Sequence, residues 1–294
     1  MSVGDAGEGP EATVQLSFSG ATARVRPDGW GEGGVVLEID GAEQSHVIPA
    51  HPERIRYEYL RRIAHLADLI GEPGEPIAAA HLGAGALTLP RYVQATRPGS
   101  AQVAVEIERE LPGFITRHLP LPPGTDLRVV IDDARAALPG LRSAAGMGSA
   151  QGFDLVVVDI FAGADSPAHL ACRDFYAEAL AQLGSRGILA VNVGDDPPLD
   201  FFVAQAAALD AAAADAGLPG PWTLTDAGML TGRRPGNLIL AAGPGWARST
   251  GPAGGGRAAS GGRAGPGAHP GLPALSRAGA SHDRSGRGPS DVVQ

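Results

Sequence analysis

The 294-residue sequence predicts an α/β fold, a doubly wound and mostly parallel sheet preceded by a small antiparallel sheet. Three observations lead to this prediction. Apolar runs that end in small or acidic residues recur between residues 77 and 193, stretches with helical spacing separate them, and alternating apolar and polar residues precede them. Strands that alternate with helices are typical of right-handed βαβ units, whose strands lie parallel.

The first part of the chain predicts a small antiparallel sheet. Asp28-Gly29 and Asp40-Gly41 stand at plausible hairpin turns between alternating runs. So short a segment has little core of its own, and we expect it to dock on the larger domain that comes after it in the chain. The alternating apolar positions are Val14, Leu16, Phe18, Val25, Val35, Leu37 and Ile39.

The parallel sheet is expected to follow a helix over residues 59–70, which Gly71 and Pro73 end. The residues at 155–158 are apolar on both faces, as a central strand covered by helices must be. Residues 222–224 and 237–241 predict an antiparallel pair at the sheet edge. The predicted parallel strands are 77–82, 102–106, 127–131, 155–159 and 188–193, with helices near 89–95, 107–118, 174–183 and 199–216.

Composition predicts four segments. Residues 1–12 have neither the basic start nor the apolar core of a signal peptide, and we expect them to be disordered. Residues 13–52 are expected to form the small sheet and 53–244 a Rossmann-like domain. Residues 245–294 are rich in Gly, Pro, Ala, Ser and Arg, so they cannot bury enough apolar surface to offset their ordering entropy, which predicts a disordered tail.

The bulk composition narrows the possible functions. A net charge of -9 and a pI near 5.3 disfavour a nucleic-acid partner, which needs a basic face. The chain contains no lysine, which excludes lysine Schiff bases and the P-loop lysine. One cysteine, Cys172, excludes an internal disulfide. The 8 histidines lack metal-ligand spacing, so no metal is expected. No apolar run predicts a membrane span, and we expect a cytoplasmic protein.

Small and acidic residues follow the first two predicted parallel strands. Gly83-Ala84-Gly85 opens a helix and either admits a ligand close to the backbone or is merely a tight turn. Glu106 ends the next strand, where an acid can accept hydrogen bonds from both hydroxyls of a ribose, or where it can be a simple exposed carboxylate.

Acids also end the third and fourth strands. Asp133 can cap the following helix or accept from an adenine amino group, and Asp132 competes for either role. Asp159 is placed to act as a general base beside a ligand crevice, or to cap the following turn. Because the carboxyl ends of parallel strands share one edge, we expect Glu106, Asp133 and Asp159 to converge on one crevice.

From about residue 35 to 242 the sequence resembles the spermidine synthase (polyamine aminopropyltransferase) family, especially its short, divergent actinobacterial-type members. Asp40-Gly41 and Gln44 match the D-G-x-x-Q motif of that family. Gly83-Ala84-Gly85 stands at its glycine-rich loop, and Val105-Glu106-Ile107 at its ribose-binding V-E-I. Further matches are Glu53-Arg54, Tyr57, Asp133-Ala134, Asp159, Pro167-Ala168, Leu170 and Phe175-Tyr176.

The resemblance implies a variant of the class I methyltransferase fold and a specific reaction. An aminopropyl group would move from decarboxylated S-adenosylmethionine to a small amine such as putrescine, with Asp159 as general base. Homodimers or homotetramers are common in this family. The implied donor-binding residues are Gln44, Gly83, Gly85, Glu106 and Asp133, and the implied amine-binding residues are Tyr57 and Asp165.

The sequence also departs from the family pattern. Ala86 replaces the acid of the glycine-rich loop, and Ile160-Phe161-Ala162 replaces the S-S-D that follows the catalytic aspartate. A buried ammonium without a partner is costly, so the polyamine half of the site looks altered while the nucleoside half is kept. Two alternatives therefore stay open, a methyltransferase that uses S-adenosylmethionine itself and a catalytically inactive nucleoside-binding relative.

Overall fold

The computed structural model describes residues 10–148, 150–162, 166–231, 233, 235–245 and 275–277. A four-stranded antiparallel sheet opens the chain, in the order β1-β2-β3-β4. Asp40 and Gly41 join β3 to β4 with φ angles of 48° and 81°, the left-handed conformation that a tight two-residue hairpin turn requires. The strands are β1 (Ala12–Gln15), β2 (Thr22–Pro27), β3 (Val35–Ile39) and β4 (Ala42–Val47).

The second sheet has eight strands in the order β12-β10-β11-β9-β8-β5-β6-β7. Strands β5 to β9 pair in parallel, whereas β10, β11 and β12 pair antiparallel. The chain leaves β5 on one side and returns as β8 on the other, which makes the carboxyl end of this strand pair a topological switch point. The strands are β5 (Ala78–Leu82), β6 (Ala101–Glu106), β7 (Asp126–Ile131), β8 (Phe153–Ala162), β9 (Leu183–Asp195), β10 (Trp222–Leu224), β11 (Gly236–Ala242) and β12 (Leu275–Arg277).

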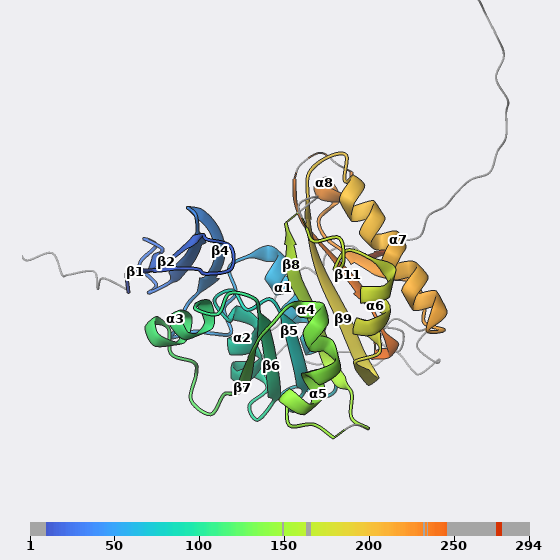
Figure 1. Ribbon diagram of the computed structural model, residues 1–294, viewed down its shortest axis with the longest axis horizontal. Coiled ribbons are helices and arrows are strands. Elements are labelled where there is room, and N and C mark those ends of the chain that lie inside the picture. Colours follow the sequence, from blue (N-terminus) through green and yellow to red (C-terminus); the bar gives the residue numbers. More distant parts are fainter. Residues whose placement is uncertain are drawn as a thin grey trace, which may run out of the picture.

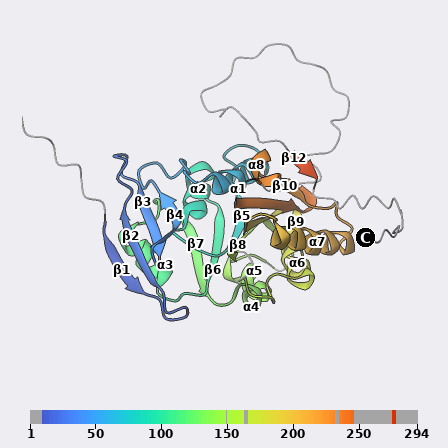
Figure 2. The same cartoon turned by 90° about the horizontal axis from the view of Figure 1, so that it is seen from above.

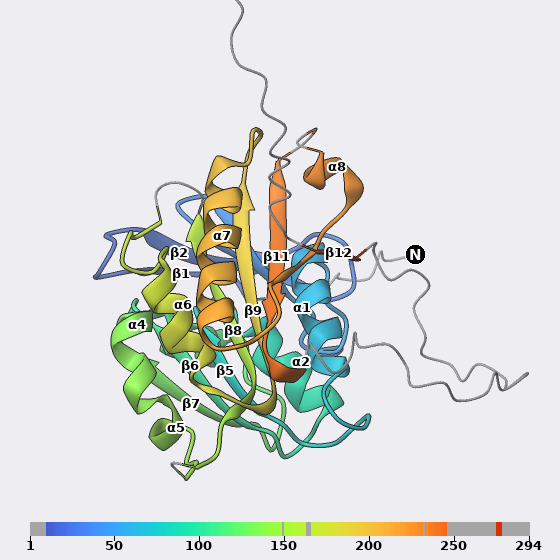
Figure 3. The same ribbon diagram turned by 90° about the vertical axis from the view of Figure 1, so that its right-hand side faces the viewer.

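Helices cover both faces of this sheet (Figures 2 and 3). Helices α1 (Glu58–Asp68) and α2 (Thr88–Thr96) lie on one face. The opposite face carries α4 (Ala134–Ala137), α5 (Leu141–Ala144), α6 (Arg173–Leu180) and α7 (Asp200–Asp215). Side chains of β8 alternate between the two cores, with Val156 and Val158 on the α6 and α7 side and Leu155 and Val157 on the α1 and α2 side. Both faces are therefore apolar, as a buried parallel sheet requires.

The small sheet docks beside the parallel sheet (Figure 1). It shares a core with the loop after β5 and with α3 (Leu111–His118), in which Leu16 and Val25 are buried with Leu87 and Phe114. The turn between β1 and β2 adds polar contacts, because the backbone N–H groups of residues 17–19 donate to the carboxylates of Glu108 and Glu110. This docking brings β4 beside the glycine-rich loop.

The predicted doubly wound, mostly parallel sheet and the antiparallel β10–β11 pair are confirmed. Helix α3 begins at Leu111 rather than at residue 107, because Pro112 favours the first helical turn. Phe18 lies in a turn and is 68% exposed, so the first alternating run ends before it. The sequence did not predict β4, α4, α5, η1 (Leu138–Gly140) or α8 (Ala227–Leu230).

Two predictions on the chain ends fall mainly outside the described residues. Disorder was predicted for residues 1–12 and 245–294, and the structure describes only residues 10–12, 245 and 275–277 of these segments. Residues 275–277 form β12 at the sheet edge, which composition did not predict. Within the described part of the chain, no helix combines the length and apolarity of a membrane span.

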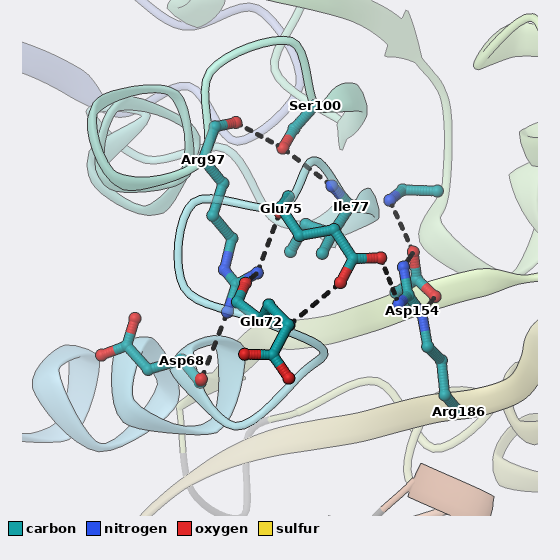
Figure 4. A network of polar contacts seen from close by, with 9 residues as sticks. Asp68, Glu72, Glu75, Ile77, Arg97, Ser100, Asp154 and Arg186 are labelled. Carbon is teal, nitrogen blue, oxygen red and sulfur yellow. Dashed lines mark hydrogen bonds and ion pairs between the residues drawn. The ribbon is translucent and has the colours of Figure 1, made fainter.

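At the amino ends of the strands, two arginines hold the loop between α1 and β5 (Figure 4). Arg97 is 2% exposed and donates to the carbonyl oxygens of Asp68, Glu72 and Glu75 at 2.9–3.2 Å. Arg186 forms ion pairs with Glu75 and Asp154 at 2.6 and 2.7 Å. The network ties this loop to β8 and β9, on the side of the sheet away from the carboxyl edge.

Substitution of Arg97 by methionine is expected to lower the free energy of unfolding by about 3 kcal/mol, because buried carbonyl oxygens lose their charged donor. Urea denaturation of the wild type and the variant measures this change. Arg109→Met, at an exposed position, is the matched control and should cost about 0.5 kcal/mol or less. Equal losses in the two variants would show that the carbonyls of the loop do not depend on Arg97.

Candidate functional site

A cavity of about 540 Å³ lies where the small sheet and α1 meet the carboxyl edge of the parallel sheet. Its walls come from β4, the start of α1, β8, β9, α8 and the start of β11. Three carboxylates and one guanidinium line it, which makes it net acidic. The lining residues are Glu43, Gln44, Tyr57, Glu58, Tyr59, Arg62, Asp159, Ile160, Asn192, Met229, Gly236 and Asn237.

Asp159 lies in this cavity near the carboxyl end of β8. Asn192 Nδ2 donates to its Oδ1 at 2.7 Å, and the Tyr59 hydroxyl lies 3.5 Å from its Oδ2. Burial raises the pKa of the carboxyl group, and the two hydrogen bonds only partly offset this effect. Both donors are uncharged, so none of the described contacts of Asp159 is an ion pair.

Two tyrosines, Tyr57 and Tyr59, line the cavity together with Asp159. Their rings stack with a centroid separation of 6.3 Å. Burial and the hydrogen bond to Glu43 raise the pKa of Tyr57 to about 12. Burial and the charge of Asp159 raise the pKa of Tyr59. Both hydroxyls therefore stay protonated at physiological pH and act as donors, to Glu43 and Asp159 respectively.

The glycine-rich loop crosses the switch point between β5 and β8. Gly83 has φ 97°, and a Cβ there would lie 2.3 Å from the Asp159 carbonyl oxygen, so only glycine fits. Protein acceptors already bind most loop N–H groups: Gly83 N donates to Val105 O, Ala84 N to Glu106 Oε2 and Ala86 N to Ser45 Oγ. Gly85 has φ 49°. The loop is braced by protein rather than left open for an anion.

Glu106 ends β6 and is 9% exposed. Its Oε2 accepts from Ala84 N at 3.1 Å and its Oε1 from Glu108 N at 3.0 Å. Burial raises the pKa of the carboxyl group, although these backbone donors oppose the shift. A carboxylate accepts about four hydrogen bonds, so Glu106 retains capacity for a ligand's hydroxyl groups.

Asp133 caps α4, one of the two roles that its position allowed. Its Oδ1 accepts from the backbone N–H of Arg135 and Ala136 at 2.9 and 3.0 Å, and its Oδ2 pairs with His169 Nε2 at 2.8 Å. Burial opposes ionisation, but these hydrogen bonds prevail and lower the pKa. The cap leaves Oδ2 as the oxygen that a ligand can share with His169.

The structure brings some of the predicted residues together and leaves others apart. Gln44, Tyr57 and Asp159 line the cavity, whereas Glu106 and Asp133 lie at the same sheet edge but are not among its lining residues. The register pairs Leu82 with both Val105 and Val158, so Glu106 and Asp159 flank β5 at one level, about 10 Å apart across two strand spacings. The three acids thus share the carboxyl edge of the sheet, but of the three only Asp159 lines this cavity.

One predicted site residue lies outside the described part of the chain, and several lining residues were not predicted. Asp165 is outside the described residues. Glu43, Glu58, Tyr59 and Asn192 line the cavity without having been predicted there. Asn192 could have been found from the sequence, because it is a polar residue within an otherwise apolar predicted strand. Among the described residues, no group of three or more His, Cys, Asp or Glu side chains is arranged to hold a metal ion.

Part of the sequence is similar to a protein of known activity. Over 142 residues the chain is 30% identical to the polyamine aminopropyltransferase of Vibrio vulnificus (strain CMCP6), a match that covers 48% of this chain and 44% of that enzyme. The chain thus spans less than half the length of this curated relative. No protein-family model matches the sequence.

Solved structures give a broader match. A probable spermidine synthase from Corynebacterium glutamicum ATCC 13032 superposes with a TM-score of 0.67 and 24% identity, covering 80% of each chain. The chain has a spermidine synthase-like fold. Spermidine synthase from Thermotoga maritima follows with a TM-score of 0.51, 16% identity, and coverage of 80% of this chain and 72% of that one. The resemblance to spermidine synthases is confirmed.

Proposed function

We propose that the protein is a spermidine synthase-like aminopropyltransferase that moves an aminopropyl group from decarboxylated S-adenosylmethionine to an amine such as putrescine. One observation carries this proposal. A half-buried carboxylate, Asp159, faces a net acidic cavity and is held by uncharged donors only among its described contacts. Such a group is suited to bind an ammonium and to take a proton from it.

The proposed reaction needs no covalent intermediate with the protein. The lone pair of the amine attacks the carbon next to the sulfonium, the C–S bonding pair moves to sulfur, and the released proton passes to Asp159. Because the sulfonium already activates the carbon, the protein contributes mainly proximity and proton removal. The products are a neutral thioether, methylthioadenosine, and a longer amine.

The nucleoside half of the site supports this donor. Glu106 keeps free acceptor capacity for ribose hydroxyls. Asp133 Oδ2, which pairs with His169, would accept from an adenine amino group at the same sheet edge. The donor carries no phosphate, and the N–H groups of the glycine-rich loop correspondingly bind protein acceptors. Gln44 reaches the cavity from β4.

The amine half is acidic despite the replaced family residues. Glu43 of β4 and Glu58 of α1 line the cavity together with Asp159. Glu43 accepts from Tyr57 at 3.1 Å and from Arg26 at 2.9 Å, and Glu58 pairs with Arg62 at 2.5 Å. These carboxylates come from the small sheet and α1, so they offer ammonium partners that Ala86 and Ala162 cannot.

The deciding experiment incubates the purified protein with decarboxylated S-adenosylmethionine plus putrescine, and separately with S-adenosylmethionine plus candidate acceptors. Mass spectrometry follows methylthioadenosine and S-adenosylhomocysteine. We expect methylthioadenosine and spermidine in the first incubation. Production of S-adenosylhomocysteine alone would identify a methyltransferase, and nucleoside binding without either product would identify an inactive relative.

The pH dependence gives a further prediction. Asp159 must be ionised to accept a proton, and burial raises its pKa, so kcat/KM should fall as the pH drops through a value above the ordinary aspartate pKa of about 4. Tyr59→Phe removes a donor to the ionised form and should move this acid limb to higher pH. Tyr176→Phe, which removes a buried tyrosine hydroxyl bound to Gln205, is the control and should leave the limb in place. An acid limb at the ordinary aspartate pKa would contradict the assignment.

A further inference from the structure

Asn192 is a buried amide in a strand that is otherwise apolar around it. It lies on β9 opposite Ile239 of β11 and is 4% exposed. Its Nδ2 donates to Asp159 at 2.7 Å, while its own carbonyl oxygen Oδ1 is buried and has no hydrogen-bond partner among the described residues. A buried unpaired amide oxygen destabilises a fold, so an apolar residue would suit this position better if folding alone mattered.

The orientation of the amide follows from its partner. An ionised carboxylate only accepts hydrogen bonds, so the NH₂ group of Asn192 must face Asp159 and the carbonyl must face away. The carboxylate is thereby fixed through one oxygen by Asn192 and approached at the other by the Tyr59 hydroxyl at 3.5 Å. The shorter contact makes Asn192 the main determinant of the direction of the carboxylate.

We propose that Asn192 is a positioning residue for Asp159, which orients the carboxylate toward the amine and favours its ionised form at the expense of an unpaired buried oxygen. The inference rests on the proposed function, because it assigns Asn192 to the base of that reaction. An amine in the cavity then meets a carboxylate that is already directed and partly desolvated. A displacement of the base by about 1 Å can slow the reaction about 100-fold.

Other titratable groups face the same cavity and belong in the test. They are Glu43 of β4, Tyr57, and Glu58, Tyr59 and Arg62 of α1. Glu43 and Glu58 each have an arginine partner, whereas the described partners of Asp159 are Asn192 and Tyr59. A change at Asn192 should therefore act on Asp159 first.

Two substitutions test the role of Asn192 in the full-length chain. Asn192→Leu removes the donor and the unpaired oxygen together. We expect kcat with putrescine and decarboxylated S-adenosylmethionine to fall about 10- to 100-fold, the KM for the donor to stay unchanged, and the melting temperature to stay level or rise. Asn192→Asp places a second carboxyl beside Asp159, and like charges raise a carboxyl pKa. The acid limb of kcat/KM should thus move upward from wild type to Asn192→Leu to Asn192→Asp.

The pKa of Asp159 can also be read without turnover. Carbon NMR of ¹³C-labelled aspartate carboxyl groups follows its titration, with the signal assigned by its loss in Asp159→Asn. An Asp159 pKa that is higher in Asn192→Leu than in wild type supports the inference even if no amine is converted, in which case only the proposed function fails. An unchanged Asp159 pKa in Asn192→Leu overturns the inference whether or not the enzyme is active.

A matched control separates positioning from packing. Gln205 of α7 is another buried amide, and it accepts a hydrogen bond from the Tyr176 hydroxyl at 2.7 Å. It is not among the residues lining the cavity, and Gln205→Leu removes it. This variant should leave the acid limb and kcat unchanged. If Asn192→Leu instead lowers the melting temperature and leaves the pH profile in place, Asn192 is a packing residue and the inference is wrong.

Discussion

Replacing Asp159 with asparagine is expected to lower kcat for methylthioadenosine formation about 10³-fold, the usual contribution of a general base. The two side chains have the same shape, so an asparagine oxygen in the place of Oδ1 can still accept from Asn192 at 2.7 Å, while the NH₂ group takes the place of Oδ2, 3.5 Å from the Tyr59 hydroxyl. What the variant loses is a group that accepts a proton. The rate is measured with saturating decarboxylated S-adenosylmethionine and putrescine, above the pH of the acid limb.

Controls distinguish lost chemistry from lost structure. Methylthioadenosine binding, followed by calorimetry, should be the same in Asp159→Asn and wild type, because the proposed nucleoside contacts involve Glu106 and Asp133 instead. Asp126→Asn, at an exposed position at the start of β7, should retain the wild-type rate. If the rate of Asp159→Asn stays within a few-fold of the wild-type rate, Asp159 is not the general base.

The sequence predicted those parts of the site that depend on strand order. Parallel strands present their carboxyl ends at one edge, so Glu106, Asp133 and Asp159 could be placed at that edge from the sequence. That β5 and β8 are neighbours, which brings Gly83 to Asp159, is known from the structure. The two roles left open for Asp133 could not be separated from sequence. The choice depends on whether backbone N–H groups of the next turn reach its side chain, and they do at 2.9 and 3.0 Å.

The rest of the cavity depends on how separate sheets dock, which periodicity does not encode. Glu43 enters from β4, a strand with only a weak alternating pattern, and faces Asp159 only because the small sheet packs on the glycine-rich loop. Asn192 meets Asp159 across two neighbouring strands, in a register that contains an irregularity between Val158 and Phe161. A one-residue difference in register would turn either side chain to the other face.

Substitution of Gly83 by alanine should destabilise the protein at least as much as the loss of Arg97, with an expected decrease of about 3 kcal/mol or more in the free energy of unfolding. Two effects add. The φ of 97° lies in a region that side chains disfavour, and the new Cβ would lie 2.3 Å from a backbone oxygen, that of Asp159. A backbone atom cannot rotate away, so either the loop or β8 must move.

Gly124→Ala separates these two effects. Gly124 also has a positive φ, of 76°, but a Cβ there would meet only Gln94 Nε2 at 3.5 Å, an ordinary contact. Urea denaturation should therefore show a loss of about 1–2 kcal/mol for Gly124→Ala, from backbone strain alone, and a clearly larger loss for Gly83→Ala. Equal losses would mean that the glycine-rich loop and β8 are not in tight contact. Because the clash falls on the residue that carries the base, the residual folded Gly83→Ala protein should also lose kcat through displacement of Asp159, which links the stability of this turn to catalysis.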